Sequence, residues 1–230
     1  MKRFYEQAAV VGGDNAWSVV LDGRTVKTPA RKSLTVPYPR LAEALAGEWQ
    51  AQQDEIDPST MCLTRLANTA LDRTAPHREQ VIDEVAAYGQ SDLLCYWAAA
   101  PDDLVARQVQ EWQPILDWLA DTYGASLAVT ADIAPLEQNN DSLLAIYSAI
   151  ARQNDFGLTG LHAATTICGS VALGLALVDR RIDAAEASAC AVLDERYQTD
   201  RWGVDADTEA RWAAQSRELA VIGEFLSLSQ

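Results

Sequence analysis

The spacing of apolar residues in this 230-residue chain changes once, near Pro39, and this change most limits the folds that it can adopt. Before that point, Trp17 to Leu21 is apolar, Arg24 to Thr28 alternates polar with apolar residues, and Asp22-Gly23 lies between them. An Asp-Gly pair in this setting is a strong signal for a tight β-hairpin. We therefore expect a small antiparallel meander at the amino terminus. Its further segments are strands at Phe4 to Val11 and Leu34 to Val36 and a turn at Gly12 to Asn15.

From Pro39 onward the apolar residues recur every three or four positions, as Leu41, Leu45 and Trp49 do, which is typical of amphipathic helices. Strands first and helices afterwards favour a segregated α+β fold over an alternating parallel sheet. We predict a β-rich part with its following helices over residues 1–90 and a larger all-helical domain over residues 91–230. The helices are expected at Thr64 to Arg73, Arg78 to Tyr88, from about Pro101 to beyond Leu119, Asn140 to Arg152, Leu158 to Asp179, Asp183 to Arg201 and Asp205 to Ser227.

The composition excludes several classes of protein. Eighteen basic residues against 33 acidic ones give a net charge of -15, so the average surface repels nucleic acid phosphates and anionic lipids. A hydrophobic content of 49% is ample for a core that needs no disulfide or metal. The four cysteines are scattered singly in apolar stretches, and we expect buried thiols in a reducing compartment. They are Cys62, Cys95, Cys168 and Cys190.

One segment is long enough to cross a membrane. Leu158 to Val178 carries no Asp, Glu, Lys or Arg. However, His162, Thr165 and Ser170 interrupt it, and Gly, Ala and Thr dominate where a lipid-facing helix uses larger apolar residues. We expect a helix buried inside a soluble protein, without membrane insertion. The first residues form neither a signal core nor a presequence, so the chain is expected in the bacterial cytoplasm.

No motif for catalysis or cofactor binding stands out. A phosphate-binding GxxxxGK[ST] loop is missing, and a turn or close helix packing explains Gly12-Gly13 and the Gly169/Gly174 pair. The two histidines, His77 and His162, have no second ligand at a metal-binding spacing. The cysteines have no neighbour that would stabilise a thiolate. We predict no catalytic residue, no metal and no cofactor.

The segment LDERYQTDRWG holds an unusual combination. Glu195, Gln198 and Trp202 fall at positions i, i+3 and i+7, which places a carboxylate, an amide and an indole on one stripe of a helix. Such a stripe suits a contact surface with another protein, where tryptophan is enriched and polar groups fix the register. The alternative is an ordinary amphipathic helix with Trp202 as a core anchor and Glu195 in water.

Seven segments together resemble one family, the assembly chaperones of the mitochondrial and α-proteobacterial F(1)-ATPase α subunit. The segments span nearly the whole chain in the family's order. They are KRFY, VVLDGRTVKTP, LAEALAGEWQAQ, IDPSTMCLTRLANTALDR, SDLLCYWAAAPDDL, QEWQPILDW and LDERYQTDRWG. Three places depart from the pattern: Cys62 replaces a common proline, Trp97 replaces a frequent arginine, and the helix around Cys168 lacks a basic residue.

The resemblance implies a non-enzymatic, monomeric holding chaperone. It would shield the unassembled α subunit from aggregation until the β subunit pairs with it, and its eukaryotic relatives would act in the mitochondrial matrix. The family's functionally important acidic residue maps to Asp194 or Glu195, and Gln198 and Trp202 match the same motif.

Two other functions remain open on sequence alone. One is an enzyme for a small substrate in a cleft between the β-rich and helical parts, with Asp72, Arg73 and Asp92 as possible polar groups. A convergent set of acid, base and anion-binding groups would be needed, and the sequence does not show one. The other is an oligomeric scaffold that uses its Trp-rich helices on itself.

Overall fold

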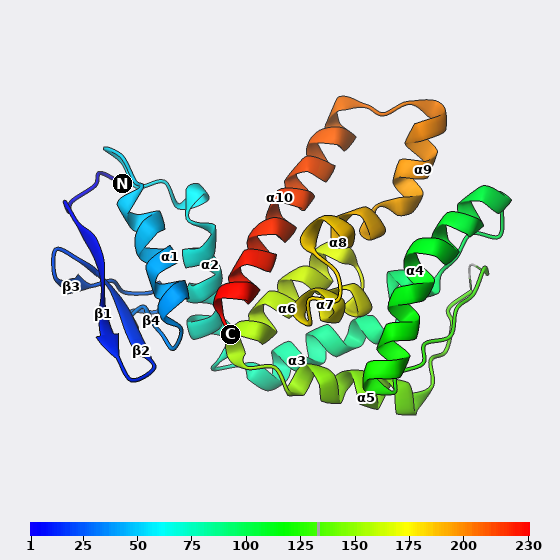
Figure 1. Ribbon diagram of the computed structural model, residues 1–230, viewed down its shortest axis with the longest axis horizontal. Helices are drawn as coiled ribbons and strands as arrows, with labels where there is room; N and C mark the ends of the chain where they lie inside the picture. Colours follow the sequence, from blue (N-terminus) through cyan, green and yellow to red (C-terminus); the bar gives the residue numbers. More distant parts are fainter. Residues whose placement is uncertain (133) are drawn as a thin grey trace. The chain divides into compact units, whose positions relative to one another are not determined.

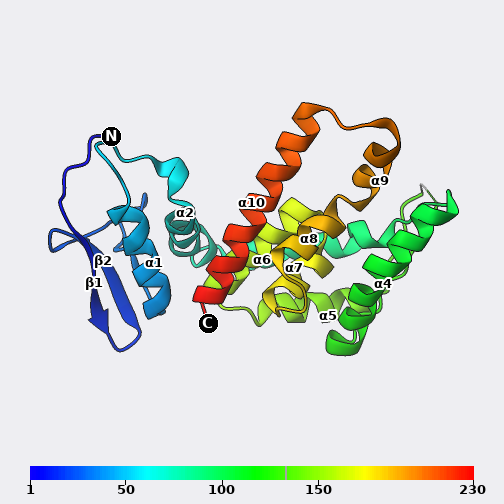
Figure 2. The same ribbon diagram turned by 45° about the horizontal axis from the view of Figure 1, so that its top comes forward.

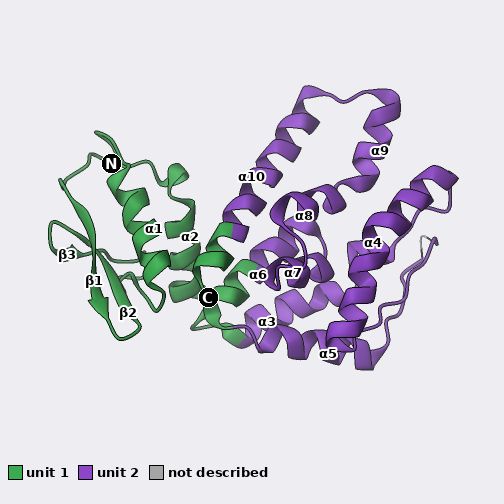
Figure 3. Ribbon diagram, viewed as in Figure 1, with its two compact units in different colours: residues 1–78, 154–160, 224–230 green, residues 79–153, 161–223 purple. Residues whose placement is uncertain are grey.

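The structure, a computed structural model, describes residues 1–132 and 134–230. The chain forms two compact units (Figure 3). Unit 1 contains Met1–Arg78, Asn154–Gly160 and Glu224–Gln230, and unit 2 contains Glu79–Gln153 and Leu161–Gly223. The division into a β-rich part with its following helices over residues 1–90 and a helical domain over residues 91–230 stays a prediction.

The sheet of unit 1 is antiparallel, as predicted, and β2 (Ala16–Leu21) is its central strand. It pairs with β1 (Ala8–Gly13), β3 (Arg24–Thr25) and β4 (Thr35–Val36) (Figure 1). The Asp22-Gly23 hairpin is confirmed, with φ values of 47° and 79° that match a two-residue turn. The prediction of a longer turn from Gly12 is wrong, because Asp14 and Asn15 already adopt the left-handed conformations that a tight turn needs.

Helices follow the sheet within unit 1. They are α1 (Pro39–Gln50), the short η1 (Pro58–Thr60), α2 (Cys62–Thr69) and the π-helical turn η2 (Ala70–Thr74). The predicted face of α1 is buried at Leu41 and Leu45, which pack on β1 and β2, whereas Trp49 is only half-buried. Phe156 joins the same unit through ring contacts with Tyr38, at 5.5 Å between centroids, and with Phe225, at 6.1 Å.

The remaining helices lie mainly in unit 2, and Figure 2 shows them from a second direction. They are α3 (Arg78–Ala86), η3 (Ala87–Gln90), η4 (Leu93–Cys95), α4 (Asp102–Tyr123), α5 (Asn140–Ala151), α6 (Asp155–Cys168), α7 (Val171–Val178), α8 (Ala184–Ala191), α9 (Leu193–Trp202) and α10 (Ala206–Leu228). All eight residues of α7 are buried, and this helix packs against α4, α8 and η3. Among the described residues, no helix has both the length and the apolarity that crossing a membrane requires.

The single helix predicted from Leu158 to Asp179 is instead two helices. Gly169 leaves the helical conformation with a φ of 66°, and the Ser170 side chain caps α7 by accepting a hydrogen bond of 3.0 Å from Leu173 N. Most of the segment is buried, as predicted. The predicted helix from Asp183 to Arg201 is likewise divided at Val192 into α8 and α9.

Asp92 connects the chain before α4 to the start of α7. Its two carboxylate oxygens accept hydrogen bonds of 3.0 Å from Leu94 N and Ala172 N. The side chain is fully buried, and this desolvation raises the pKa of the carboxyl group. The geometry gives Asp92 a structural role in joining two segments of unit 2.

Candidate functional site

Helix α9 carries the predicted contact stripe, and two buried residues fix the orientation of the helix. Leu193 and Tyr197, one turn apart, face the interior with 8% and 4% exposure. The helix ends at Gly203, whose φ of 85° favours glycine. Glu195, Gln198 and Trp202 are all exposed.

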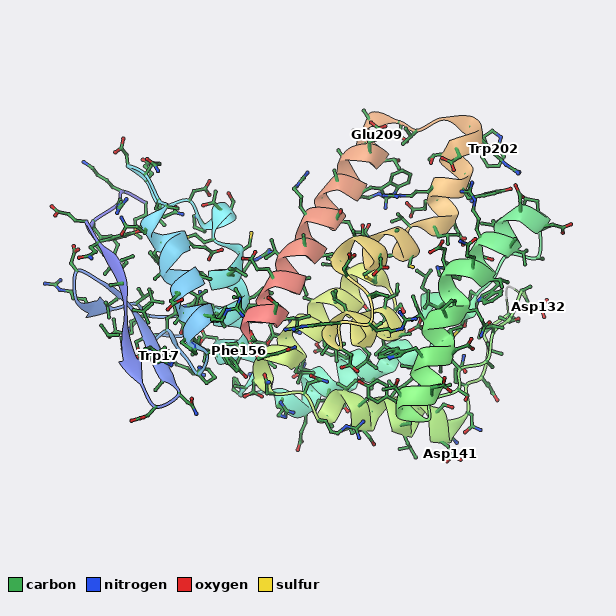
Figure 4. All side chains as sticks on the ribbon, in the orientation of Figure 1. Trp17, Asp132, Asp141, Phe156, Trp202 and Glu209 are labelled. Atoms are coloured by element: carbon green, nitrogen blue, oxygen red, sulfur yellow. The ribbon has the colours of Figure 1, made fainter. Side chains whose placement is uncertain are left out.

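Trp202 is the most exposed aromatic side chain of this helix. Its exposed fraction is 77%, and it lies at the carboxyl end of α9 (Figure 4). The interpretation of Trp202 as a core anchor is therefore wrong. Val204, two residues further on, is also exposed at 40%, so two apolar side chains lie close together in the chain at the end of the helix.

Glu195 is accessible but not free in water, contrary to the ordinary amphipathic interpretation. Its Oε2 accepts hydrogen bonds of 2.7 Å from Arg211 Nη2 and from Trp212 Nε1, both on α10. The hydrogen bond from Arg211 is the main cause that lowers the pKa of the Glu195 carboxyl. Arg196 adds a second link, since its guanidinium carbon lies 5.7 Å from the centre of the Trp212 ring. These contacts hold α9 against α10.

The neighbouring Asp194 has a different environment. It is half-buried and accepts a hydrogen bond of 2.8 Å from Nε2 of the buried Gln108 on α4. Gln108 Oε1 in turn accepts from Ala98 N at 2.8 Å. Burial raises the pKa of the Asp194 carboxyl, whereas that of Glu195 is lowered. Of the two acidic candidates, Glu195 is thus the one on the accessible stripe. Gln198 lies between it and Trp202, and within the described residues its amide makes no hydrogen bond.

A polar network that sequence reasoning missed fixes the other side of α9 on α4. Tyr197 donates a hydrogen bond of 2.5 Å to Asp103 Oδ1, and Arg201 donates one of 2.6 Å to Asp103 Oδ2. Arg107 pairs with Asp200 at 3.1 Å. The hydrogen bond from Tyr197 is the largest cause that lowers the pKa of Asp103. The partners lie 93 to 98 residues apart, so no local pattern could have revealed them.

The residues of the enzyme alternative have structural partners instead. Asp72 accepts hydrogen bonds of 2.8 Å from the Thr28 hydroxyl and from Ala30 N, within unit 1. Asp92 is the buried connector of unit 2 described above. His162 Nε2 lies 3.0 Å from Glu84 Oε2, so this histidine has a partner within unit 2. Among residues 1–132 and 134–230, no group of three or more His, Cys, Asp or Glu side chains is placed to hold a metal ion.

The chain resembles known proteins in both sequence and structure. The profile of the ATP12 chaperone protein family matches residues 2–120. Protein atp12, mitochondrial, of Schizosaccharomyces pombe is 22% identical over 214 residues, which are 88% of this chain and 74% of that protein. The structure of Atp12 from Paracoccus denitrificans is 39% identical, with a TM-score of 0.96, and the match covers 100% of this chain and 98% of that chain. A structure from Agrobacterium tumefaciens is 33% identical with a TM-score of 0.89, covering 98% of this chain and 86% of that one.

The likeness covers both the β-rich and the helical elements, so the predicted α+β fold is confirmed. The matching family is one of chaperones rather than enzymes, which removes the small-substrate enzyme as an interpretation. A surface helix held by two neighbours, with an exposed indole at its end, agrees with a protein that contacts other proteins. The chain belongs to the ATP12 chaperone protein family.

Proposed function

We propose that this protein is an ATP-independent assembly chaperone that binds the unassembled α subunit of F(1)-ATPase and prevents its aggregation until the β subunit pairs with it. Membership of the ATP12 chaperone family supports the chaperone role. The motif resemblance over LDERYQTDRWG and six other segments supports the α subunit as the client. We further propose that it works as a monomer in the bacterial cytoplasm.

The exposure of Trp202, on a helix that is hydrogen-bonded to both α4 and α10, is the observation that carries this proposal. An indole that is 77% exposed leaves a large apolar area in water, which costs free energy unless a partner covers it. Tryptophan is also the residue type most enriched at interface positions that dominate binding energy. Trp202 is thus the proposed anchor of the client interface.

The contacts of α9 prepare this surface before binding. Asp103 on α4 and Arg211 on α10 fix the helix through Tyr197 and Glu195. A partner that binds a fixed helix loses less conformational entropy than one that must order it. Gln198 and the remaining lone pairs of Glu195 can then set the register of a bound protein surface by hydrogen bonds.

The proposal is tested by diluting denatured F(1) α subunit into buffer and following its aggregation by light scattering. We expect the unmodified protein to suppress aggregation equally with and without Mg-ATP. Trp202→Ala should weaken holding by tenfold or more, since loss of an interface anchor costs about 2 kcal/mol or above. Leu144→Ala is the matched control, because Leu144 on α5 is also an apolar side chain with high exposure, 64%. Full protection by Trp202→Ala would exclude α9 as the client surface, and an unprotected α subunit with the unmodified protein would exclude the proposed client.

A further inference from the structure

The sheet of unit 1 ends on one side at β1, and this strand has a free edge. Within residues 1–132 and 134–230, β1 pairs with β2 alone, whereas β3 and β4 both pair with β2 on its other side. An edge strand presents a row of backbone N–H and C=O groups that can pair with another extended chain. The free edge of β1 is therefore a surface whose chemistry fits one more strand.

The hydrogen bonds of β2 show which residues of β1 face this edge. Val19 lies opposite Val10 in the register. Its N–H donates to Leu34 O at 3.2 Å, and its C=O accepts from Val26 N at 2.9 Å, so both groups point away from β1. Bonded and non-bonded pairs alternate along an antiparallel ladder. The even-numbered residues of β1 therefore direct their backbone N–H and C=O groups to the free edge.

One position of the edge already holds an amide group from α1. The Gln50 side chain accepts a hydrogen bond of 2.7 Å from Ala8 N and donates one of 3.4 Å to Glu6 O. One residue of an added strand would likewise offer an acceptor and a donor. The next groups are Ala8 C=O and the N–H and C=O of Val10, and no hydrogen bond to them occurs among the described residues. The edge ends at Gly12, whose φ of 138° favours glycine.

β1 lacks the features that usually protect a sheet edge from pairing. Its sequence, AAVVGG, contains no charged residue and no proline. Val11 has an exposed fraction of 49%, and Val10 is half-buried. A β-branched side chain on an added strand can pack beside Val11 as a cross-strand pair. The free edge therefore suits an extended segment with an apolar centre.

The charges around β1 distinguish a foreign segment from a second copy of this chain. Residues 4–15 contain Glu6 and Asp14 but no Lys or Arg. Two copies paired antiparallel about Val10 would bring Glu6 of one opposite Asp14 of the other, and like charges in such a pair are destabilising. That pairing would also need the Ala8 N–H, which Gln50 already holds. A foreign segment with basic residues at its ends would meet opposite charges instead.

We propose that the free edge of β1 binds an extended segment of a client protein, with β-branched residues at its centre and basic residues at its ends. The segment adds to the sheet as a further strand. Its backbone donates to the C=O groups of Ala8 and Val10 and accepts from the Val10 N–H. The inference rests on the proposed holding of unassembled protein, but it does not use the α9 surface, which lies in unit 2.

Backbone-modified peptides test this contact without changing the protein. The full-length chain is titrated into fluorescein-labelled Lys-Val-Thr-Val-Lys-amide, and fluorescence anisotropy gives the affinity. Two further peptides carry N-methyl groups, one on both valines and the other on the threonine and the last lysine. Because only one side of an added strand faces β1, one of these should bind about tenfold more weakly and the other like the parent peptide. Equal affinities of the two methylated peptides would overturn the proposal.

The charge of the peptide is tested in the same assay. Replacing both lysines by glutamate should weaken binding about tenfold at low salt, since like charges then lie beside Glu6 and Asp14. Equal binding of the basic and acidic peptides would overturn the assignment of a segment with basic ends.

Two variants of Val10 separate its N–H from its side chain. Val10→Pro removes the outward N–H without removing a bond of the sheet, and proline is accommodated at such edge positions. Val10→Ala is the matched control, because it shortens the side chain and keeps the N–H. We expect Val10→Pro to weaken the basic peptide about tenfold and Val10→Ala to change it by less than about twofold. Equal affinities of the two variants would overturn the proposed pairing.

Amide hydrogen exchange of the unmodified protein gives the same test should Val10→Pro fail to fold. The Val10 amide should exchange rapidly in the free protein and about tenfold or more slowly with saturating peptide. The Val11 amide is the internal control, because it already pairs with Ser18 inside the sheet and should stay protected throughout. Unchanged exchange at Val10 would overturn the proposal.

Two more measurements distinguish this inference from its alternatives. Sedimentation that shows a dimer, lost in Val10→Pro, would assign the edge to a second copy and overturn the client segment. Trp202→Ala should bind the peptide with the parent's affinity, because its change lies in unit 2. Failure of the α9 surface in the aggregation assay would thus leave peptide binding intact, and loss of peptide binding would leave the α9 test unaffected.

Discussion

The indole Nε1 of Trp212 and the guanidinium of Arg211 both donate to the same oxygen of Glu195, each at 2.7 Å. Two consecutive residues of α10 thus hold one carboxylate of α9. The arrangement favours the ionised form and lowers the pKa of Glu195 below its ordinary value of 4.5. The Glu195 carboxylate is therefore charged and held in a fixed orientation by α10.

Glu195→Gln should reveal this contribution as a pH-dependent loss of stability. Because the folded-state pKa is lowered, the stabilisation is fully present above pH 4.5 and is lost as the pH falls through the folded-state pKa. The side chain is 48% exposed and screened by solvent, so we expect a loss of no more than about 1 kcal/mol at pH 7. Urea unfolding of parent and variant at pH 7 and below pH 4 measures it. Glu209→Gln removes an exposed charge from the start of α10 and serves as the control; an equal, pH-independent loss in both variants would contradict the expectation.

Trp202→Ala should leave the fold almost unchanged. At 77% exposure the indole makes few contacts to lose, and surface substitutions of this kind stay within about 0.5 kcal/mol. Trp112→Ala is the opposite case, since Trp112 is 1% exposed and donates a hydrogen bond of 3.1 Å to Cys190 O. That variant should lose about 3 kcal/mol or more. If the melting temperature of Trp202→Ala fell below the parent's by as much as that of Trp112→Ala, Trp202 would be a structural residue.

The sequence predicted those parts of the fold that short-range rules control. The Asp22-Gly23 hairpin depends on two adjacent residues, and the buried face of α1 depends on a spacing of four. The single helix is predicted there because Gly169 is explained by close helix packing and Ser170 counts only as a polar interruption of an apolar segment, whereas the two residues form a helix stop followed by a cap.

For the candidate site, the sequence predicted which residues are exposed but not which residues they contact. Helical spacing placed Glu195, Gln198 and Trp202 on one exposed stripe, which the structure bears out as geometry. What Glu195 contacts depends on α10, and Tyr197 reaches Asp103 over 94 residues of sequence. Such pairings follow from how helices pack, and no periodicity within one helix encodes them. The role of the stripe in client binding stays a prediction.

Gly174→Ala should destabilise the protein through the packing of α6 on α7. A Cβ at this position would overlap the Thr165 hydroxyl and lie 3.0 Å from Leu161 Cδ1, in a helix that is buried on all sides. Overpacking of this kind costs about 1 to 3 kcal/mol. Gly47→Ala in α1 is the control, because nothing lies within 4 Å of its Cβ position. Alanine should there raise stability by up to about 1 kcal/mol. Urea midpoints that move in the same direction for both variants would refute the packing argument.

The four cysteines should divide into one reactive thiol and three inert ones. Burial raises the pKa of Cys95, Cys168 and Cys190 to about 12 each, which leaves only about one thiolate in ten thousand at pH 8. Cys62, at the start of α2, is only half-buried, so the sequence-based expectation of a fully buried thiol does not hold there.

In the native protein at pH 8, a disulfide reagent such as DTNB should therefore release about one equivalent of chromophore rapidly, and all four only after denaturation. Cys62→Ser identifies the site, because the fast phase should disappear while the slow phase keeps its amplitude. The variant should melt like the parent, since the replaced thiol is partly exposed at the start of α2 and a serine hydroxyl can replace it as the donor to Ser59 O, which the sulfur contacts at 3.6 Å. A fast phase that survives Cys62→Ser would mean that one of the three interior thiols is exposed by an opening of unit 2, where all three lie.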